Sequence, residues 1–141
     1  MSLPPAIIDT NVVVSGVLTS EPQAPTLRIL DGMLAGRFPL LLSIDLLAEY
    51  RSVLLRPGIR RRHRLAPPEI DAVLTEITAN GQVREVVSGL LDQGDGDEHL
   101  KALLADRPES VLVTGDEALR KRLPANRSVA PRDFVRRLVE N

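Results

Sequence analysis

Two short apolar runs in this sequence each lead to an aspartate, and this pattern constrains the fold more than any other feature. Ala6–Ile8 is followed directly by Asp9, and Val111–Val113 is followed by Asp116 three positions later. Short, wholly apolar runs of this kind are typical of buried parallel strands. Because open α/β folds hold their sites at the carboxyl ends of parallel strands, the two aspartates are expected to converge at one edge of a sheet.

The rest of the sequence alternates strand and helix candidates. The expected strands are 6–8, 38–42, 83–87, 110–114 and 128–129, and the expected helices are 25–36, 44–55, 67–79, 97–105, 116–123 and 133–139. The segment 11–18 suits a strand by its valine content and a helix by its length. A helix is favoured because the chain must turn away after a central strand. This alternation predicts an α/β protein with a three-layer α/β/α fold, a parallel sheet of four to five strands and a single domain over residues 1–141.

Composition excludes several kinds of site. The 141 residues include no cysteine, so disulfides and thiolate metal sites are absent. Phe38, Tyr50 and Phe134 are the only aromatic residues, which argues against base stacking on aromatic side chains. The glycines form neither a P-loop nor a dinucleotide fingerprint. No apolar stretch approaches the roughly 20 residues of a membrane span and no export signal is visible, so a cytoplasmic protein without membrane contact is expected.

Charge is distributed unevenly although the net charge is only −1. Residues 51–64 hold six arginines and no acid, whereas residues 92–98 hold four acids and no base. This separation suits an enzyme that holds a metal and binds a polyanion, but two solvated surface segments would show the same pattern. Contact with a nucleic-acid backbone is the favoured interpretation of the basic segment, with an acidic partner or solvent as alternatives. The arginines expected to contact that backbone are Arg56, Arg60, Arg61 and Arg62.

Four acids occupy positions that this layout brings to the carboxyl edge of the sheet. They are Asp9, Glu49, Asp97 and Asp116. Oxygen ligands without histidine or cysteine suit Mg²⁺ or Mn²⁺, and such a metal can activate water and stabilise charge on a phosphodiester. Asn11 and Thr114 lie beside two of the acids and are candidates for orienting a carboxylate or a metal-bound water.

Each of these features has a simpler explanation when it is taken alone. Asp9 suits a turn, Glu49 a solvated helix position and Asp116 a helix N-cap, so only their joint arrangement favours a metal site. The acidic segment lacks the spacing of a calcium-binding EF-hand. His63 is expected to contact phosphate or solvent and His99 to lie on a helix surface, and neither is expected to be catalytic.

Four short motifs follow one another in order between Ile7 and about Leu123. The motifs are Asp9-Thr10-Asn11, Glu49 in the helix after the second strand, Asp97 three residues before Leu100, and Thr114-Gly115-Asp116 followed by Leu119. In this order and at this spacing they resemble the PIN-domain nucleases, in particular the bacterial toxins of toxin–antitoxin pairs (VapC-like).

The resemblance implies a metal-dependent endoribonuclease in which the four acids hold one or two Mg²⁺ or Mn²⁺ ions. Asp9 and Asp97 would be primary ligands, Asp116 a looser one, and Glu49 would reach the metal through water. A metal-activated water would attack the phosphorus in line with the departing 3′ oxygen. Asp95 or Glu98 could share the role given to Asp97. The resemblance also implies a homodimer and an antitoxin partner.

Two rival functions remain open. An aspartate-nucleophile phosphotransferase also begins with a strand-end aspartate, but it generally has a second Asp two residues later, where this chain has Asn11. It also needs a suitably placed lysine, and Lys101 and Lys121 are the only two in the chain. The other rival is a non-catalytic module that keeps the fold and binds RNA or a protein.

Overall fold

Five short parallel strands form the centre of the computed structural model, which describes residues 3–86 and 96–140. They are β1 (Ala6–Ile8), β2 (Leu41–Leu42), β3 (Gln82–Val83), β4 (Val111–Val113) and β5 (Ser128–Val129). Strands β1, β4 and β5 pair in that order, and β2 pairs with β3. A parallel bridge from Ala6 to Leu40 joins the two groups, and the Ala6 N–H donates to the Pro39 carbonyl at 2.9 Å. The strand order is therefore β3-β2-β1-β4-β5, with β1 at the centre.

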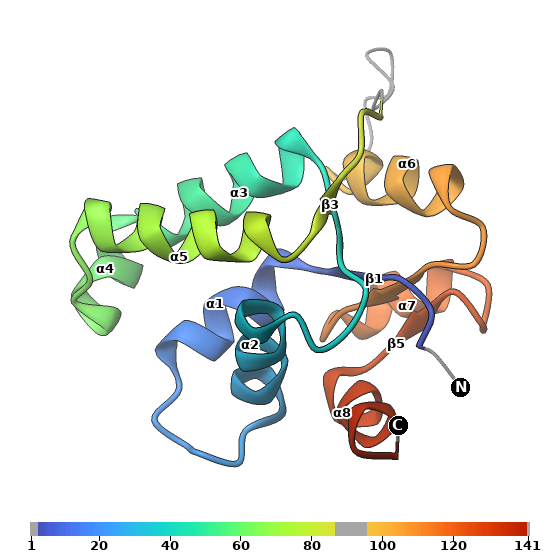
Figure 1. Ribbon diagram of the computed structural model, residues 1–141, viewed down its shortest axis with the longest axis horizontal. Coiled ribbons are helices and arrows are strands. Elements are labelled where there is room, and N and C mark those ends of the chain that lie inside the picture. The colour runs from blue at the N-terminus through green and yellow to red at the C-terminus, as the bar shows by residue number, and fades with distance from the viewer. Residues whose placement is uncertain (1–2, 87–95, 141) are drawn as a thin grey trace.

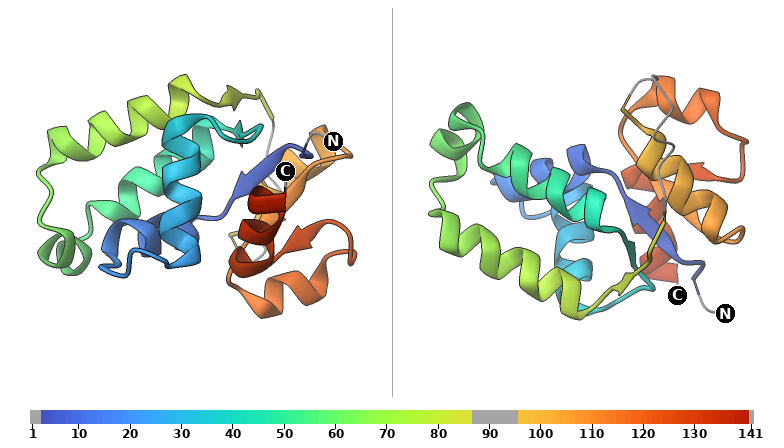
Figure 2. Two further views of the ribbon diagram at one scale, coloured as in Figure 1. Left: turned by 60° about the horizontal axis from the view of Figure 1, so that its bottom comes forward. Right: turned by 90° about the horizontal axis from the view of Figure 1, so that it is seen from above.

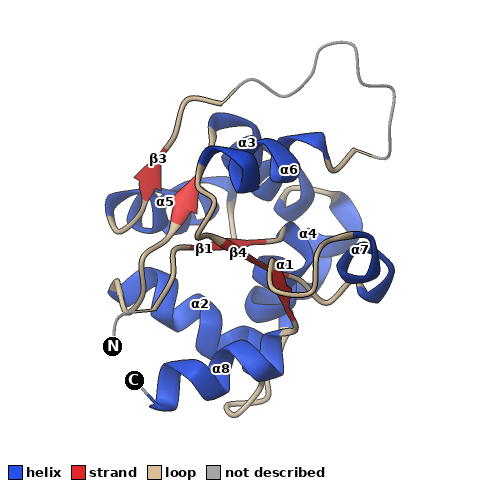
Figure 3. Cartoon of the chain, turned by 90° about the vertical axis from the view of Figure 1, so that its right-hand side faces the viewer, coloured by secondary structure: helices blue, strands red, loops and turns tan. Residues whose placement is uncertain are grey.

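Helices cover both faces of these strands. They are α1 (Thr10–Leu18), α2 (Pro25–Ala35), α3 (Ile44–Leu54), α4 (Pro57–His63), α5 (Pro67–Ala79), α6 (Glu98–Asp106), α7 (Glu117–Arg122) and α8 (Pro131–Glu140). Figure 1 shows α3, α5 and α6 on one side of β1 and α1, α2 and α8 on the other. Figure 3 shows α3 and α6 on one side of β1 and β4 and α2 and α8 on the other, and Figure 2 gives two further views of the chain. The predicted α/β/α fold is confirmed.

A polar side chain caps the helix that follows each of three strands. Asp9 follows β1 and caps α1, Ser43 follows β2 and caps α3, and Asp116 comes after β4 and caps α7. The caps satisfy backbone N–H groups that have no partner within the helix, for example Leu46 N, which donates to Ser43 Oγ at 3.1 Å. These polar side chains therefore gather at the carboxyl ends of the strands.

The structure corrects the predicted boundaries in several places. The ambiguous segment 11–18 is helical, as favoured, but the strand predicted at 83–87 reduces to β3, while residues 84–86 are outside any strand and Val87 lies outside the described residues. The strand predicted at 38–42 narrows to β2. The arginine-rich segment forms α4, for which no helix was predicted. Pro57 at the first position suits a helix start, because the missing N–H of proline has no partner there in any helix.

The interior is aliphatic, and all three aromatic side chains are buried in it. Phe38 and Phe134 meet edge to face with ring centroids 5.0 Å apart, which joins the segment before β2 to α8. Within the described ranges, no helix combines the length and the apolar character that crossing a membrane would need.

Replacing Gly16 by alanine is expected to destabilise the protein by about 1–3 kcal/mol, because α1 and α2 approach too closely there for a methyl group. An added Cβ would lie 2.7 Å from the Thr26 carbonyl oxygen and 3.1 Å from Leu30 Cβ. Urea unfolding followed by circular dichroism measures the loss.

Gly58→Ala on α4 is the matched control. The nearest atom to its Cβ is the mobile end of Arg61, at 3.9 Å, so alanine should stabilise that helix by about 0.5–1 kcal/mol. Equal effects at the two glycines would contradict the close packing of α1 on α2.

Candidate active site

Asp9 is the most constrained acid of the candidate site. It ends β1, is only 8% exposed, and its own N–H donates to the Val113 carbonyl of β4 at 2.9 Å. Its Oδ1 accepts a hydrogen bond from Thr10 N at 2.8 Å. Its Oδ2 accepts from the Thr114 hydroxyl at 2.7 Å and from the Asn11 amide at 3.2 Å. The central strands and three donors therefore fix this carboxylate.

Burial raises the pKa of Asp9 above its ordinary value, because removal from water disfavours the charged form. Hydrogen bonds from Thr114 and from the Thr10 N–H oppose this effect, while the nearby charges of Glu49 and Asp116 raise the pKa further. The surroundings of Asp9 therefore disfavour its charged form, and its hydrogen bonds only partly offset this effect.

Thr114→Val is expected to raise the pKa of Asp9 further and to destabilise the protein by about 1–3 kcal/mol at neutral pH, because a buried carboxylate loses a donor. A raised pKa in the folded state means that the contribution of Asp9 to stability is full below its ordinary pKa and declines as pH rises through the raised value. The loss caused by valine should therefore shrink in acid. Urea unfolding at neutral and acidic pH tests this.

Thr75→Val provides the control for that substitution. Thr75 is exposed on α5 and its hydroxyl donates only to the Asp71 carbonyl, at 2.8 Å. Its replacement should change the free energy of unfolding by no more than about 0.5 kcal/mol at either pH. A loss at Thr114 that is the same in acid as at neutral pH would show that the hydroxyl does not act through the Asp9 charge.

Glu49 projects from α3 toward Asp9 and is held through both of its oxygens. Its Oε1 accepts a short hydrogen bond from the Thr10 hydroxyl, and its Oε2 lies 3.1 Å from His99 Nε2. Tyr50, the next residue, is fully buried and donates a short hydrogen bond to the Ile8 carbonyl. These two residues of α3 therefore tie that helix to the end of β1.

His99 is a site residue that sequence reasoning missed. Its side chain is only 11% exposed and touches Glu49, so the prediction of a surface position was wrong. Its Nδ1 is buried without a hydrogen-bond partner among the described residues. One signal was present in the sequence: His99 precedes the buried Leu103 by four positions and so shares its helix face.

Asp97 and Asp116 come from the starts of α6 and α7. Asp97 Oδ2 accepts from Arg122 Nη2 at 3.4 Å. Asp116 is exposed, and its Oδ1 accepts from Leu119 N at 3.0 Å. The Asp116 N–H donates to the Thr114 hydroxyl oxygen at 3.0 Å, so one hydroxyl connects Asp116 to Asp9.

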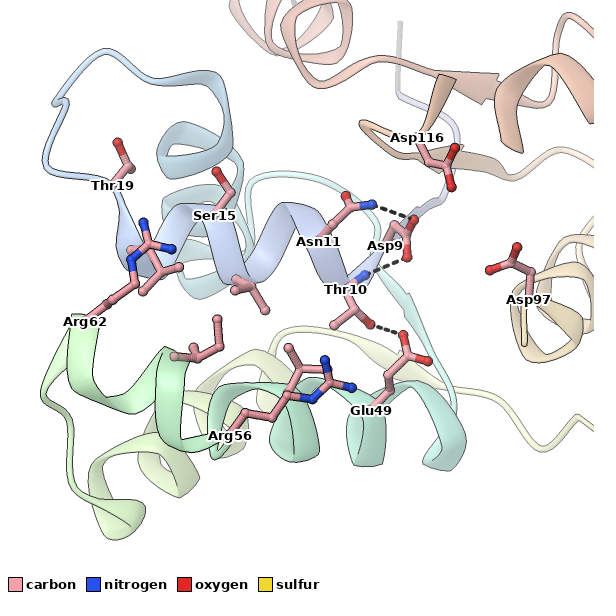
Figure 4. A pocket seen from close by; sticks show the side chains of 14 residues that line it. Asp9, Thr10, Asn11, Ser15, Thr19, Glu49, Arg56, Arg62, Asp97 and Asp116 are labelled. Carbon is pink, nitrogen blue, oxygen red and sulfur yellow. Dashed lines mark hydrogen bonds between the residues drawn. The ribbon is translucent and has the colours of Figure 1, made fainter. Parts of the chain in front are cut away.

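The four acids line one cleft of about 780 Å³, whose lining side chains are drawn in Figure 4. All four predicted acids and Asn11 line it, whereas Thr114 is fully buried next to Asp9. The predicted arginines divide into two pairs. Arg56 and Arg62 line this cleft, while Arg60 and Arg61 line a separate hollow with Arg64.

Both ring nitrogens of His63 have protein partners, which the sequence did not indicate. Its Nε2 lies 2.9 Å from the Leu54 carbonyl oxygen, and its Nδ1 accepts from Leu65 N at 2.8 Å. In this arrangement Nε2 donates and Nδ1 accepts. The imidazole therefore links the end of α3 to the residues after α4.

The chemistry of the donor set fits a hard divalent cation, since all four acids offer only oxygen. Among the described residues, however, no three acidic or histidine side chains are close enough to form a ready metal cage. The carboxylates are instead held by protein donors such as Thr114, His99 and Arg122. The predicted Asp95 lies outside the described residues.

The fold has three α/β/α layers, and its acids face one cleft at the carboxyl edge of the parallel strands. These features define an α/β protein whose active site lies at that edge. The family model of the PIN domain matches residues 5–118, well over half of the chain, and the chain therefore belongs to the PIN domain family. PIN domains are typically nucleases, and they usually bind divalent metals such as Mg²⁺. No curated protein matches the chain.

Proposed function

We propose that this chain is a metal-dependent endoribonuclease that hydrolyses RNA phosphodiester bonds, and that it is the toxin of a toxin–antitoxin pair in the cytoplasm. The observation that carries the nuclease proposal is the gathering of Asp9, Glu49, Asp97 and Asp116 around one cleft. The charges of Glu49 and Asp116 raise the pKa of Asp9, so a cation between these acids would relieve their repulsion.

The four carboxylates would hold Mg²⁺ or Mn²⁺, which supplies an activated water and stabilises negative charge at phosphorus. Asp9 is the anchor, because Thr114, Thr10 and Asn11 fix both of its oxygens. Glu49 is kept beside it by Thr10 and His99. Arg56 and Arg62 line the same cleft and supply positive charge for the RNA backbone.

Incubation of the purified protein with a single-stranded RNA in Mn²⁺, in Mg²⁺ or with a chelator tests this proposal. Cleavage that needs the metal and stops on chelation supports it. If no RNA is cut and calorimetry detects no metal binding, the chain is a non-catalytic module. Covalent labelling of Asp9 by a phosphate donor would instead favour the phosphotransferase.

The toxin role, the homodimer and the antitoxin partner rest on the resemblance of the four motifs to toxin sequences. Expression of the chain alone should arrest growth, and co-expression of a small protein encoded beside it should restore growth. Light scattering of the purified protein measures its oligomeric state. Normal growth under strong expression of an active nuclease would contradict the toxin role without affecting the proposed chemistry.

A further inference from the structure

The cleft has two chemically different ends. The acidic end holds the four carboxylates beside Asn11. The rest of the lining comes from α1 and its C-cap (including Ser15, Leu18 and Thr19) and from α3, α4 and the N-cap of α4 (Val53, Ile59, Arg62 and Arg56). Figure 4 shows Arg56 and Arg62 on the wall opposite α1, with Arg62 next to Thr19 and the Arg56 guanidinium pointing toward Glu49. The part of the cleft away from Asp97 and Asp116 therefore combines apolar side chains with two arginines.

The length of the cleft follows from α1, which forms one of its sides. Asp9 and Thr19 are the two caps of that helix, and both line the cleft. At the helical rise of about 1.5 Å per residue, the caps lie about 15 Å apart. A stacked nucleic-acid strand rises about 3.4 Å per nucleotide, so this length corresponds to about four nucleotides. The cleft is longer than one scissile phosphate requires.

The two arginines are available for a ligand. Within the part of the chain that the structure describes, neither Arg56 nor Arg62 forms an ion pair, whereas Arg51 pairs with Asp71 at 2.7 Å. Guanidinium groups bind phosphate oxygens through paired N–H donors. Two arginines that have no ion pair among the described residues and share a cleft with the acids match a polyanion that reaches past the acids.

Four apolar side chains also line the cleft. Val14, Leu18, Val53 and Ile59 offer contact area to a ribose or base, but no hydrogen bonds that would identify a base. None of the residues that line the cleft is aromatic. The hydroxyls of Ser15 and Thr19 already have protein partners, the Thr26 hydroxyl and the Glu21 N–H. Binding here should therefore depend mainly on phosphate charge and differ little between sequences.

We infer that the arginine end of the cleft is a binding subsite for single-stranded RNA on one side of the scissile bond, in which Arg56 and Arg62 hold two backbone phosphates. The inference rests on the proposed ribonuclease function and deepens it. Arg60 and Arg61 face the separate hollow and have no part in this subsite. The RNA strand runs from the acids along α1 toward α4.

Equilibrium binding of a fluorescent oligouridylate of about twelve nucleotides, measured over a series of KCl concentrations, tests the inference. An Asp9→Asn background prevents cleavage during the measurement. Arg56→Ala with Arg62→Ala should weaken binding about tenfold or more. The same pair should reduce the slope of log affinity against log salt by about 1.4, since each single-strand phosphate contact contributes about 0.7. Arg60→Ala with Arg61→Ala is the matched control and should leave the slope nearly unchanged.

Cleavage kinetics on the otherwise unchanged chain give a second measurement. Loss of Arg56 and Arg62 should raise KM by a similar factor with little change in kcat, because the subsite binds the ground state and the transition state alike. RNA extended on only one side of the cleaved bond should retain this effect.

Any of three results would overturn the inference while the ribonuclease proposal stands. The first is an equal salt slope for the variant that lacks Arg56 and Arg62 and the variant that lacks Arg60 and Arg61. The second is a loss of binding confined to the variant that lacks Arg60 and Arg61. Chains that cut RNA normally after loss of Arg56 and Arg62, but no longer bind a partner protein, would also overturn it and assign that end of the cleft to the partner. Failure of the unchanged chain to bind or cut any RNA would overturn both proposals together.

Discussion

Asp9→Asn is expected to lower the rate of metal-dependent RNA cleavage by on the order of 10²–10³, the largest effect on activity of any single change in this chain. Asp9 is the most buried of the four acids, and donors fix both of its oxygens. Asparagine keeps the size of the side chain but removes its charge, so the cation would lose its anchor. Initial rates of cleavage of a labelled RNA measure the change.

The same substitution should abolish the thermal stabilisation that a divalent cation gives. A ligand that binds only the folded state raises Tm with its concentration, so Mn²⁺ should raise the Tm of the unchanged chain and leave that of Asp9→Asn unaffected. This readout is independent of RNA. It also separates a lost metal site from a lost substrate contact.

Asp71→Asn is the matched control, since it makes the same chemical change outside the cleft. Asp71 is exposed and pairs with Arg51, which holds the pKa of its carboxyl below the ordinary value. Cleavage and the Mn²⁺ shift should both survive in this variant. A fully active, folded Asp9→Asn protein would contradict the role given to Asp9.

The sequence predicted those parts of the site that depend on strand ends. Asp9 and Asp116 follow apolar runs, and parallel strands necessarily bring such ends to one edge. The cap positions were also readable, because Ser43 and Asp116 are residue types that satisfy the first N–H groups of a helix. Local patterns therefore indicated two of the four acids that line the cleft, Asp9 and Asp116.

The contacts between distant helices could not be predicted in this way. His99 reaches Glu49 from 50 positions away, and Arg122 reaches Asp97 from 25. These contacts depend on how α6 packs against α3 and on where α7 lies. The periodicity of hydrophobic residues within one helix gives no information about either. The separation of the arginines into two sites has a related reason, because the helix α4 was not predicted. On this helix Arg62 lines the cleft, whereas Arg60 lines the other hollow.

Phe134→Ala is expected to destabilise the protein by about 3–5 kcal/mol, the largest loss of stability among the changes considered. Phe134 is fully buried on α8 and meets Phe38 edge to face, and α8 packs against α2. Alanine would leave a cavity and remove an aromatic pair in a domain whose total stability is about 5–15 kcal/mol. Val139→Ala is the control on the same helix, because Val139 is 65% exposed and its loss should cost no more than about 0.5 kcal/mol.

This change also tests whether α8 acts on the site or only on the fold. Phe134 lies beyond the segment that matches the PIN domain, and it does not line the cleft. Cleavage per folded molecule should therefore be unchanged well below the Tm, while urea unfolding shows the full loss. A loss under about 1 kcal/mol would mean that α8 packs weakly on α2. A fall in activity of the folded protein would instead mean that α8 supports the acids through α2 and α1, which pack in succession between it and the cleft.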